Sequence, residues 1–184
     1  MQVTLSMQRN RIIVLFICMS LAIGSMAQTS SKDKKIVADA VEAKADFIKT
    51  DGLMSSLFAN AYGYVIFPNV GKGGIGVGGA AGNGAVYQQG ILIGMAKMTQ
   101  VTIGFQFGGQ EYREVIFFET KAALDRFKQN KVEFSAQASA VAATAGASAN
   151  AKYKDGVMIF TQVKGGLMYE ASVGGQKFDF SAFK

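Results

Sequence analysis

The chain has 184 residues, a formal net charge of +6, one cysteine and no histidine. Without histidine it can form no Ser-His-Asp or Cys-His nucleophile, no imidazole metal site and no histidine general base. A single cysteine allows neither an internal disulfide nor a thiolate cluster. The composition therefore favours a binding or architectural protein over an enzyme, and we expect no catalytic residues, no metal and no cofactor.

The N-terminal segment has the pattern of an export signal. Residues 12–24 form an apolar run between two arginines and a Ser-Met-Ala sequence, which is typical of a cleavable secretory leader. The run is shorter than the roughly 18–20 residues that a membrane-spanning helix needs. We expect residues 1–27 to be a signal peptide, starting at Met1 or Met7, and residues 28–184 to form one exported domain, periplasmic or secreted. That domain would keep no cysteine and a net charge of +4.

The next segment, residues 31–50, has the periodicity of an amphipathic helix, and Ser31 is the expected N-cap. Lys44 falls inside the apolar arc of this helix. Its stem could lie on the core while the ammonium reaches solvent, or the ammonium could meet a lipid headgroup. Shorter helices are expected over residues 52–61, with Asp51 as the cap, and over residues 120–129, capped by Thr120.

From residue 62 the hydrophobic period changes to two, which indicates strands. Fourteen of the 22 glycines lie between Gly63 and Gly109, and we interpret them as a sign of strong strand curvature. The alanine-rich residues 135–151 predict a mobile loop or a weak strand. Together these features predict one α+β domain with a closed or nearly closed antiparallel sheet. The expected strands are residues 64–67, 75–81, 85–88, 91–94, 101–107, 113–118, 157–163, 167–173 and 177–180. The expected turns are residues 82–84, 89–90, 108–109, 165–166 and 174–175.

No motif in the sequence supports catalysis. Residues 74–79 have the Gly-x-Gly-x-x-Gly spacing of a dinucleotide site, but no helix follows and no carboxylate lies about 20 residues further on. Two Ser-x-x-Lys spacings lie close to the expected ends of the mature chain, where a lysine is too solvated to act as a base. Glu111 and Glu114 are three apart on a strand, so they point to opposite faces, and we expect both to be solvated.

The charge distribution suggests an anionic partner. Between residues 52 and 110 there is no acidic residue, and Lys72 and Lys97 are the only charges. Three lysines, Lys32, Lys34 and Lys35, open the first helix. Each basic residue near an anionic bilayer contributes only about 1 kcal/mol, so inserted apolar surface would have to supply the remaining affinity. Nucleic acid is not expected as a partner, because there is no dense Arg/Lys stripe.

Four segments of the chain resemble the SYLF domain of eukaryotic actin-patch and phosphoinositide-binding proteins and of exported bacterial proteins. These segments are Tyr62–Ala80 (YGYVIFPNVGKGGIGVGGA), Met98–Gln110 (MTQVTIGFQFGGQ), Ile116–Phe127 (IFFETKAALDRF) and Gly165–Phe178 (GGLMYEASVGGQKF). The resemblance implies a small antiparallel β-barrel with about three helices packed on its outside. It also implies phospholipid binding rather than catalysis.

In the eukaryotic relatives an N-terminal amphipathic helix is credited with phosphoinositide contact. An exported protein meets neither actin nor ordinary phosphoinositides, so the resemblance points to an anionic bacterial phospholipid at an envelope membrane. Two alternatives are a cell-envelope structural or protein-interaction scaffold without a lipid ligand and an integral outer-membrane barrel, which the amphipathic helices disfavour. Carried onto this sequence, the resemblance implies lipid contacts at Lys32, Lys34, Lys35, Ile36, Val37, Lys44 and Phe47, to which the charge distribution adds Lys72 and Lys97.

Overall fold

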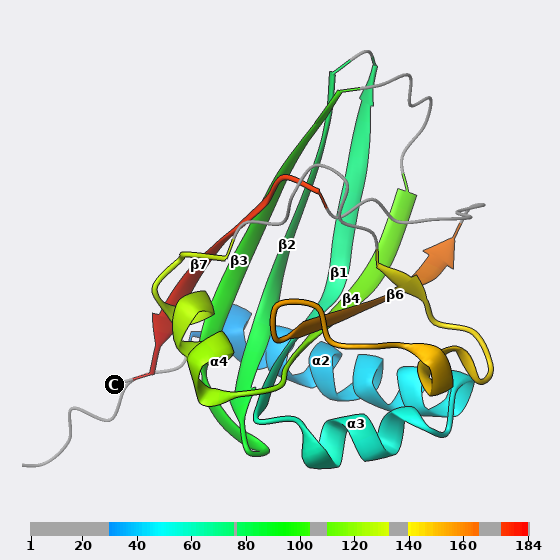
Figure 1. The fold of residues 1–184 in the computed structure, drawn as a ribbon. Helices are drawn as coiled ribbons and strands as arrows, with labels where there is room; N and C mark the ends of the chain where they lie inside the picture. The colour runs from blue at the N-terminus through cyan, green and yellow to red at the C-terminus, as the bar shows by residue number, and fades with distance from the viewer. Residues whose placement is uncertain (1–29, 76, 104–109, 133–139, 166–173, 184) are drawn as a thin grey trace, which may run out of the picture.

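The computed structural model describes residues 30–75, 77–103, 110–132, 140–165 and 174–183. Helices precede and interrupt a run of long strands (Figure 1), which confirms the α+β class. The elements in chain order are α2 (Ser31–Thr50), α3 (Met54–Asn60), β1 (Gly63–Ile75), β2 (Val77–Gln88), β3 (Ile91–Ile103), β4 (Gln110–Phe118), α4 (Lys121–Lys128), β5 (Val141–Ala142), the 3-10 turn η1 (Ala147–Asn150), β6 (Val157–Gly165) and β7 (Gln176–Ala182).

The strands form one sheet in the order β5-β6-β4-β1-β2-β3-β7. All neighbours are antiparallel except β5 and β6, which are parallel. The expected closed barrel is not formed, because β5 and β7 are edge strands of the described sheet and do not pair. One reason is the composition of the β5 edge. This strand contains only two residues, in an alanine-rich segment with little propensity to extend a ladder.

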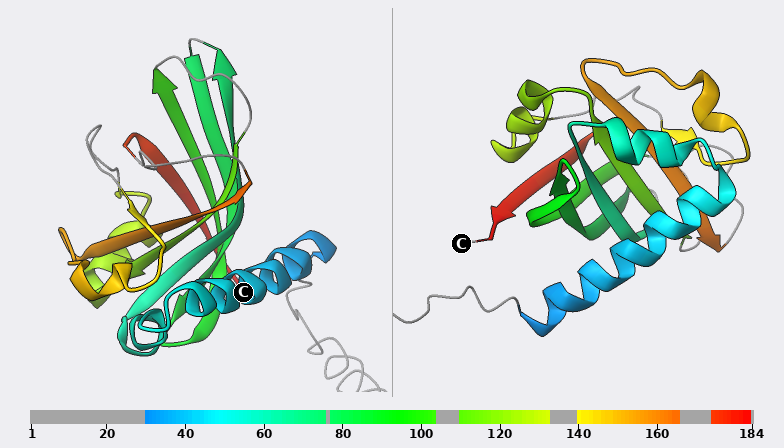
Figure 2. Two further views of the ribbon diagram at one scale, coloured as in Figure 1. Left: turned by 90° about the vertical axis from the view of Figure 1, so that its right-hand side faces the viewer. Right: turned by 90° about the horizontal axis from the view of Figure 1, so that it is seen from below.

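The strongly curved sheet has a separate core on each face. On the convex face, α2 and α3 pack through Ala40, Phe47 and Phe58 against outward-facing residues of the sheet. On the concave face, α4 packs through Leu124 and Phe127. In Figure 1, α2 passes behind the strands while α4 lies in front of them, and Figure 2 shows how strongly the sheet curls between the two layers.

Two of the expected helix caps differ in detail from the structure. The N-cap of α2 is Ser30 rather than Ser31. The Ser30 hydroxyl accepts a hydrogen bond from the Asp33 N–H, and the Asp33 carboxylate accepts one from the Ser30 N–H, which completes a capping box. The second helix is shorter than expected and begins at Met54, and its N-cap is Leu53 rather than the expected Asp51. For α4, the predicted Thr120 cap is confirmed, since its hydroxyl accepts from the Ala123 N–H.

The prediction of a turn at residues 82–84 is wrong, because these residues lie inside β2. A Cβ at Gly84 would lie 2.7 Å from the Ile66 carbonyl oxygen and 2.7 Å from the Phe67 ring. Glycine is present here because β2 lies very close to β1 and not because the chain reverses direction. The register of β1 shifts on either side of Pro68, the only proline of the chain, which marks a bulge.

Other turn and loop predictions have mixed outcomes. The turn at residues 89–90 is confirmed, with φ of +48° at Gln89 and +78° at Gly90, and so is the turn at residues 174–175, where Gly175 has φ +75°. The expected strand 167–173 and the turn at 108–109 lie outside the described residues. Within the alanine-rich segment, residues 140–151 contain the short strand β5 and the turn η1.

Candidate functional site

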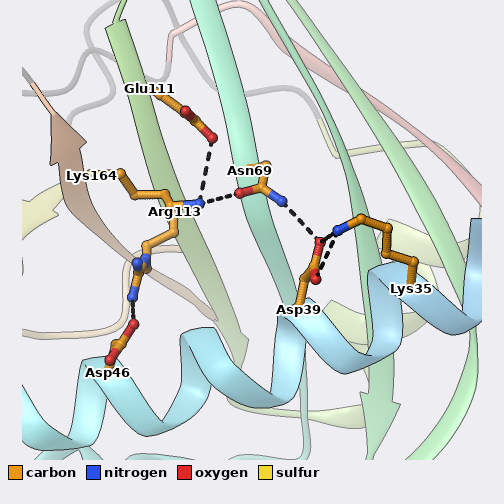
Figure 3. A network of polar contacts seen from close by, with 7 residues as sticks. All are labelled: Lys35, Asp39, Asp46, Asn69, Glu111, Arg113 and Lys164. Carbon is orange, nitrogen blue, oxygen red and sulfur yellow. Dashed lines mark hydrogen bonds and ion pairs between the residues drawn. The ribbon is translucent and has the colours of Figure 1, made fainter.

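Helix α2 carries seven of the expected lipid-contact residues, and the structure fastens it firmly to the sheet. Phe47 has no exposed surface, and Val37 is half-buried against the same convex core. On the polar side, Arg113 of β4 forms an ion pair with Asp46 (Figure 3). Phe47 therefore faces the protein core in this structure and presents no surface to an external ligand.

A second set of polar contacts holds the middle of α2 against β1, β4 and β6 (Figure 3). The Lys35 ammonium lies 2.9 Å from the Asp39 carboxylate, which also accepts a hydrogen bond of 3.2 Å from the Asn69 amide. Asn69 accepts in turn from Lys164, whose ammonium lies 3.4 Å from the Glu111 carboxylate. Lys35 is thus engaged on the helix itself, although its side chain is 75% exposed.

Lys44 lies over two aromatic rings. Its ammonium donates a hydrogen bond of 3.2 Å to the Tyr64 hydroxyl and lies 4.9 Å from the centre of the Phe58 ring and 5.2 Å from that of Tyr64. Burial lowers the pKa of Lys44. The cation–π contacts and the hydrogen bond account for a lysine within the apolar arc of α2. These contacts hold the Lys44 ammonium where α2, α3 and β1 meet.

The remaining candidates divide between the two faces of the sheet. Lys32 and Ile36, from the first half of α2, line a groove together with Lys97 of β3, whereas Lys34 is exposed on the helix. Lys72 pairs with Ala80, which belongs to the concave core, and so lies on that face. Burial lowers the pKa of Lys72. The structure therefore brings Lys32, Ile36 and Lys97 together and places Lys72 elsewhere.

The groove has a volume of about 240 Å³ and lies between the first turns of α2 and the strands β2, β3 and β7. We call it the α2–β3 groove. Two lysines and two aspartates line it together with the apolar residues Ile36, Met95 and Phe180. Its lining residues are Lys32, Asp33, Ile36, Asn83, Met95, Ala96, Lys97, Asp179, Phe180 and Ser181.

The two carboxylates of the α2–β3 groove do not lie in equivalent surroundings. Asp33 accepts a hydrogen bond from the Ser30 N–H as part of the helix cap. Asp179 is exposed on β7, directly opposite Lys97 in the register of the β3–β7 pair. Sequence reasoning missed Asp179 and Met95, because only the pairing of β7 with β3 brings Asp179 next to Lys97.

Two kinds of feature, a cluster of metal-ligating side chains and a membrane-spanning helix, were sought among the described residues. Across these ranges, no group of three or more His, Cys, Asp or Glu side chains comes close enough to hold a metal ion. No helix among the described residues is both long and apolar enough to cross a membrane.

Comparison with known proteins agrees with the resemblance seen in the sequence. Residues 99–181 match the model of the Ysc84 family, described as Las17-binding protein actin regulator. This part of the chain belongs to the Ysc84 (SYLF) family. The matched SYLF segment includes Asp179 of the groove and all of β7 except Ala182, whereas α2 lies outside it.

A relative of the same family, beta cell expansion factor A of Aeromonas veronii, is 32% identical over 123 residues. The aligned residues are 66% of this chain and 47% of the relative. The chain therefore spans about half the length of that SYLF protein.

Proposed function

We propose that this SYLF protein is a non-enzymatic module that binds anionic phospholipid at the surface of an envelope membrane. The observation that carries the proposal is the α2–β3 groove, which is lined by Lys32 and Lys97 together with the apolar residues Ile36 and Met95. An anionic headgroup could pair with the ammonium groups while the start of its acyl chains contacts the apolar side chains. Membership of the SYLF family supports a lipid-associated or actin-patch-type module.

The magnitudes favour a reversible, peripheral association. Two lysines near an anionic bilayer contribute about 2 kcal/mol together, and the nearby Asp33 and Asp179 reduce that attraction. Apolar contact from Ile36 and Met95 would supply the remaining affinity. We place this activity in an exported protein, periplasmic or secreted, because residues 1–27 have the pattern of a signal peptide.

A protein-binding scaffold without a lipid ligand is the second candidate function. The family description supports it, since it names a Las17-binding actin regulator. Export would remove actin as a partner, so the scaffold would bind another protein of the cell envelope. This function requires no preference for anionic vesicles, and that difference separates the two candidates experimentally.

Vesicle co-sedimentation of the full exported protein tests the lipid proposal. We expect at least tenfold more binding to phosphatidylcholine vesicles containing 30% phosphatidylglycerol than to pure phosphatidylcholine. The double variant Lys32→Gln/Lys97→Gln should bind the anionic vesicles about 30-fold more weakly, the equivalent of about 2 kcal/mol.

The matched control is Lys49→Gln/Lys131→Gln, which removes the same charge from two exposed lysines outside the groove. This control should bind within about threefold of the wild type. Equal binding to both kinds of vesicle would favour the scaffold. An equal loss in both double variants would show that net charge, rather than the groove, governs binding.

A further inference from the structure

The concave face of the sheet carries a cluster of polar side chains within an otherwise apolar core. Each of its five residues is buried, with at most 3% of its surface exposed, and they come from four different strands. We call this cluster the inner polar band. Its members are Gln100 of β3, Tyr112 and Glu114 of β4, Thr161 of β6 and Gln176 of β7.

Strand register explains why these residues meet. Gln100 lies opposite Gln176 in the β3–β7 pair, and Glu114 lies opposite Thr161 in the β4–β6 pair. In the order of the sheet, β4 and β7 are separated by β1, β2 and β3. Nevertheless the Gln176 side-chain amide donates a hydrogen bond of 3.0 Å to Glu114 Oε2. The contact joins two strands across the concave side of the curled sheet, so the two halves of the inner polar band face each other there.

Two oxygens of the inner polar band lack a hydrogen-bond donor. Glu114 Oε1 and Gln176 Oε1 are both buried, and neither has a hydrogen-bond partner in the structure as described. Glu114 is also in no ion pair with any described residue. Leaving a carboxylate buried without a countercharge costs several kcal/mol, and burial raises the pKa of Glu114 to about 7. Glu114 and Gln176 are joined by a hydrogen bond, and each has one further oxygen without a donor. A positively charged group with several N–H donors would supply both the missing hydrogen bonds and the countercharge.

The chemistry of the inner polar band narrows the class of ligand. An anion would be repelled by the Glu114 carboxylate and would leave Glu114 Oε1 and Gln176 Oε1 without a donor. A divalent metal prefers several charged or carbonyl oxygens, and within the described ranges Glu114 belongs to no group of three metal-ligating side chains. An ammonium of the R–NH₃⁺ type carries one positive charge and three N–H donors, which match one carboxylate and neighbouring neutral oxygens.

We propose that the inner polar band binds a primary ammonium group. Glu114 supplies the countercharge, and the oxygens Glu114 Oε1 and Gln176 Oε1 each accept one N–H. The hydroxyl oxygen of Tyr112 or Thr161 accepts the third. The ammonium belongs either to a soluble amine or to the headgroup of an aminophospholipid.

A row of paired residues on the concave face runs from Gln100 of the inner polar band to the half-buried Lys72 and Gln110. Gln100 lies opposite Ala80, Ala80 opposite Lys72, and Lys72 opposite Gln110, so these residues form one row across the concave face. Gln100 is buried, whereas Lys72 and Gln110 are half-buried. The short side chain of Ala80 lies in the middle of the row.

Calorimetric titration of the full exported protein at pH 8 tests the site, with ethanolamine and choline as matched probes. Both carry one positive charge, but the quaternary ammonium of choline has no N–H donor. We expect ethanolamine to bind at least tenfold more tightly than choline. Glu114→Gln should weaken ethanolamine binding at least tenfold, while Lys32→Gln/Lys97→Gln should bind it as the wild type does, because those lysines lie in the α2–β3 groove.

Circular dichroism checks that each variant folds, and Gln176→Met provides a second test that leaves the carboxyl in place. It should weaken ethanolamine binding by at least threefold. Equal affinities for ethanolamine and choline, no heat with either probe, or unchanged binding in both folded variants would overturn the proposal.

Binding to vesicles distinguishes a lipid headgroup from a soluble amine as the source of the ammonium. The wild type should prefer phosphatidylcholine vesicles containing phosphatidylethanolamine over pure phosphatidylcholine, and Glu114→Gln should lose that preference, if the ligand is a lipid headgroup. Ethanolamine binding without a vesicle preference would assign the site to a soluble amine. This test does not depend on the α2–β3 groove. If Lys32→Gln/Lys97→Gln loses binding to phosphatidylglycerol vesicles, we still expect it to bind ethanolamine as the wild type does.

Discussion

Glu114 lies on the concave face of the sheet with its carboxyl fully buried, and burial raises its pKa from 4.5 to about 7. The hydrogen bond from Gln176 opposes this shift but is the smaller effect. Glu111, three residues earlier on the same strand, points to the convex side and pairs with Lys164. The two carboxylates thus do lie on opposite faces, as their spacing predicts. The expectation that both are solvated is wrong for Glu114.

The raised pKa of Glu114 makes stability depend on pH. Between about pH 4.5 and 7 the folded protein holds a proton that the unfolded chain has released. This stabilising contribution is therefore complete below about pH 4.5 and is lost as the pH rises through about 7. Glutamine keeps the shape of the neutral carboxyl but does not ionise. Glu114→Gln should gain about 3 kcal/mol in unfolding free energy, relative to the wild type, between pH 4.5 and pH 8.

Urea unfolding of both proteins at pH 4.5 and pH 8 measures this difference. Glu111→Gln is the control, because its side chain is 56% exposed and its substitution should give the same difference at both pH values. A Glu114→Gln effect that does not change with pH would contradict the assignment of a buried, uncompensated carboxyl.

At the scale of elements, the glycines of β1 and β2 differ in how closely other atoms approach them. The sequence pattern does not show this difference. A Cβ at Gly84 would lie 2.7 Å from a backbone oxygen of β1, whereas one at Gly71 would have nothing within 4 Å. Gly84 permits close contact between β2 and β1 next to the bulge at Pro68. Gly71 lies on the same hairpin in open space.

These two glycines form a matched pair for mutagenesis. Gly84→Ala should destabilise the protein by about 1–3 kcal/mol, because the added methyl group would force backbone of β1 and the Phe67 ring to move. Gly71→Ala should change the unfolding free energy by no more than about 0.5 kcal/mol. Chemical denaturation of both variants measures the contrast. Similar losses at both positions would show that backbone flexibility, rather than close packing, is what the glycines provide.

At the scale of the whole molecule, contacts between distant segments hold the two layers in place. Asp51 is buried between α2 and α3, and its carboxylate accepts hydrogen bonds from the N–H groups of Leu53 (3.1 Å) and Ser148 (2.8 Å). Burial alone would raise its pKa, but hydrogen bonds from Ser148, Leu53 and Gly146 outweigh that effect and lower it. Asp51 thus joins the helical layer to the 3-10 turn η1 almost 100 residues later.

Removing this connection should cost stability in a pH-dependent way. Asp51→Ala leaves buried N–H groups without an acceptor and should lower the unfolding free energy at pH 7 by about 2 kcal/mol. Because the folded pKa is lowered, the contribution is complete above the unfolded pKa and is lost as the pH falls through the folded value. The difference between variant and wild type should therefore shrink under acid conditions.

Thermal unfolding at pH 7 and at pH 3 measures the effect of Asp51→Ala. Glu42→Ala, an exposed carboxylate on α2, is the control and should stay within about 0.5 kcal/mol of the wild type. A loss of the same size at both pH values would show that the charge on Asp51 does not contribute.

The sequence by itself determined the class of the fold and the positions of most elements. Periodicities of 3.6 and 2, helix caps such as Thr120 and the Gln89-Gly90 turn are local signals, since each depends on residues only a few positions apart. The SYLF resemblance rests on such local motifs as well. The same reasoning placed Lys32 and Ile36 on one helix, but it could not separate them from Phe47 and Lys44, which the fold turns toward the core.

Tertiary structure alone decided which residues meet across the sheet. The pairing of β7 with β3 creates the α2–β3 groove by bringing Asp179 beside Lys97. The curl of the sheet brings Gln176 to Glu114 although three strands separate them in the sheet order. Strand order and curvature depend on summed packing over the whole chain, and alternation along one strand carries no information about its partner. For that reason the sequence predicts that Glu114 lies on a strand, but it cannot show that Glu114 is buried and contacts Gln176 of β7.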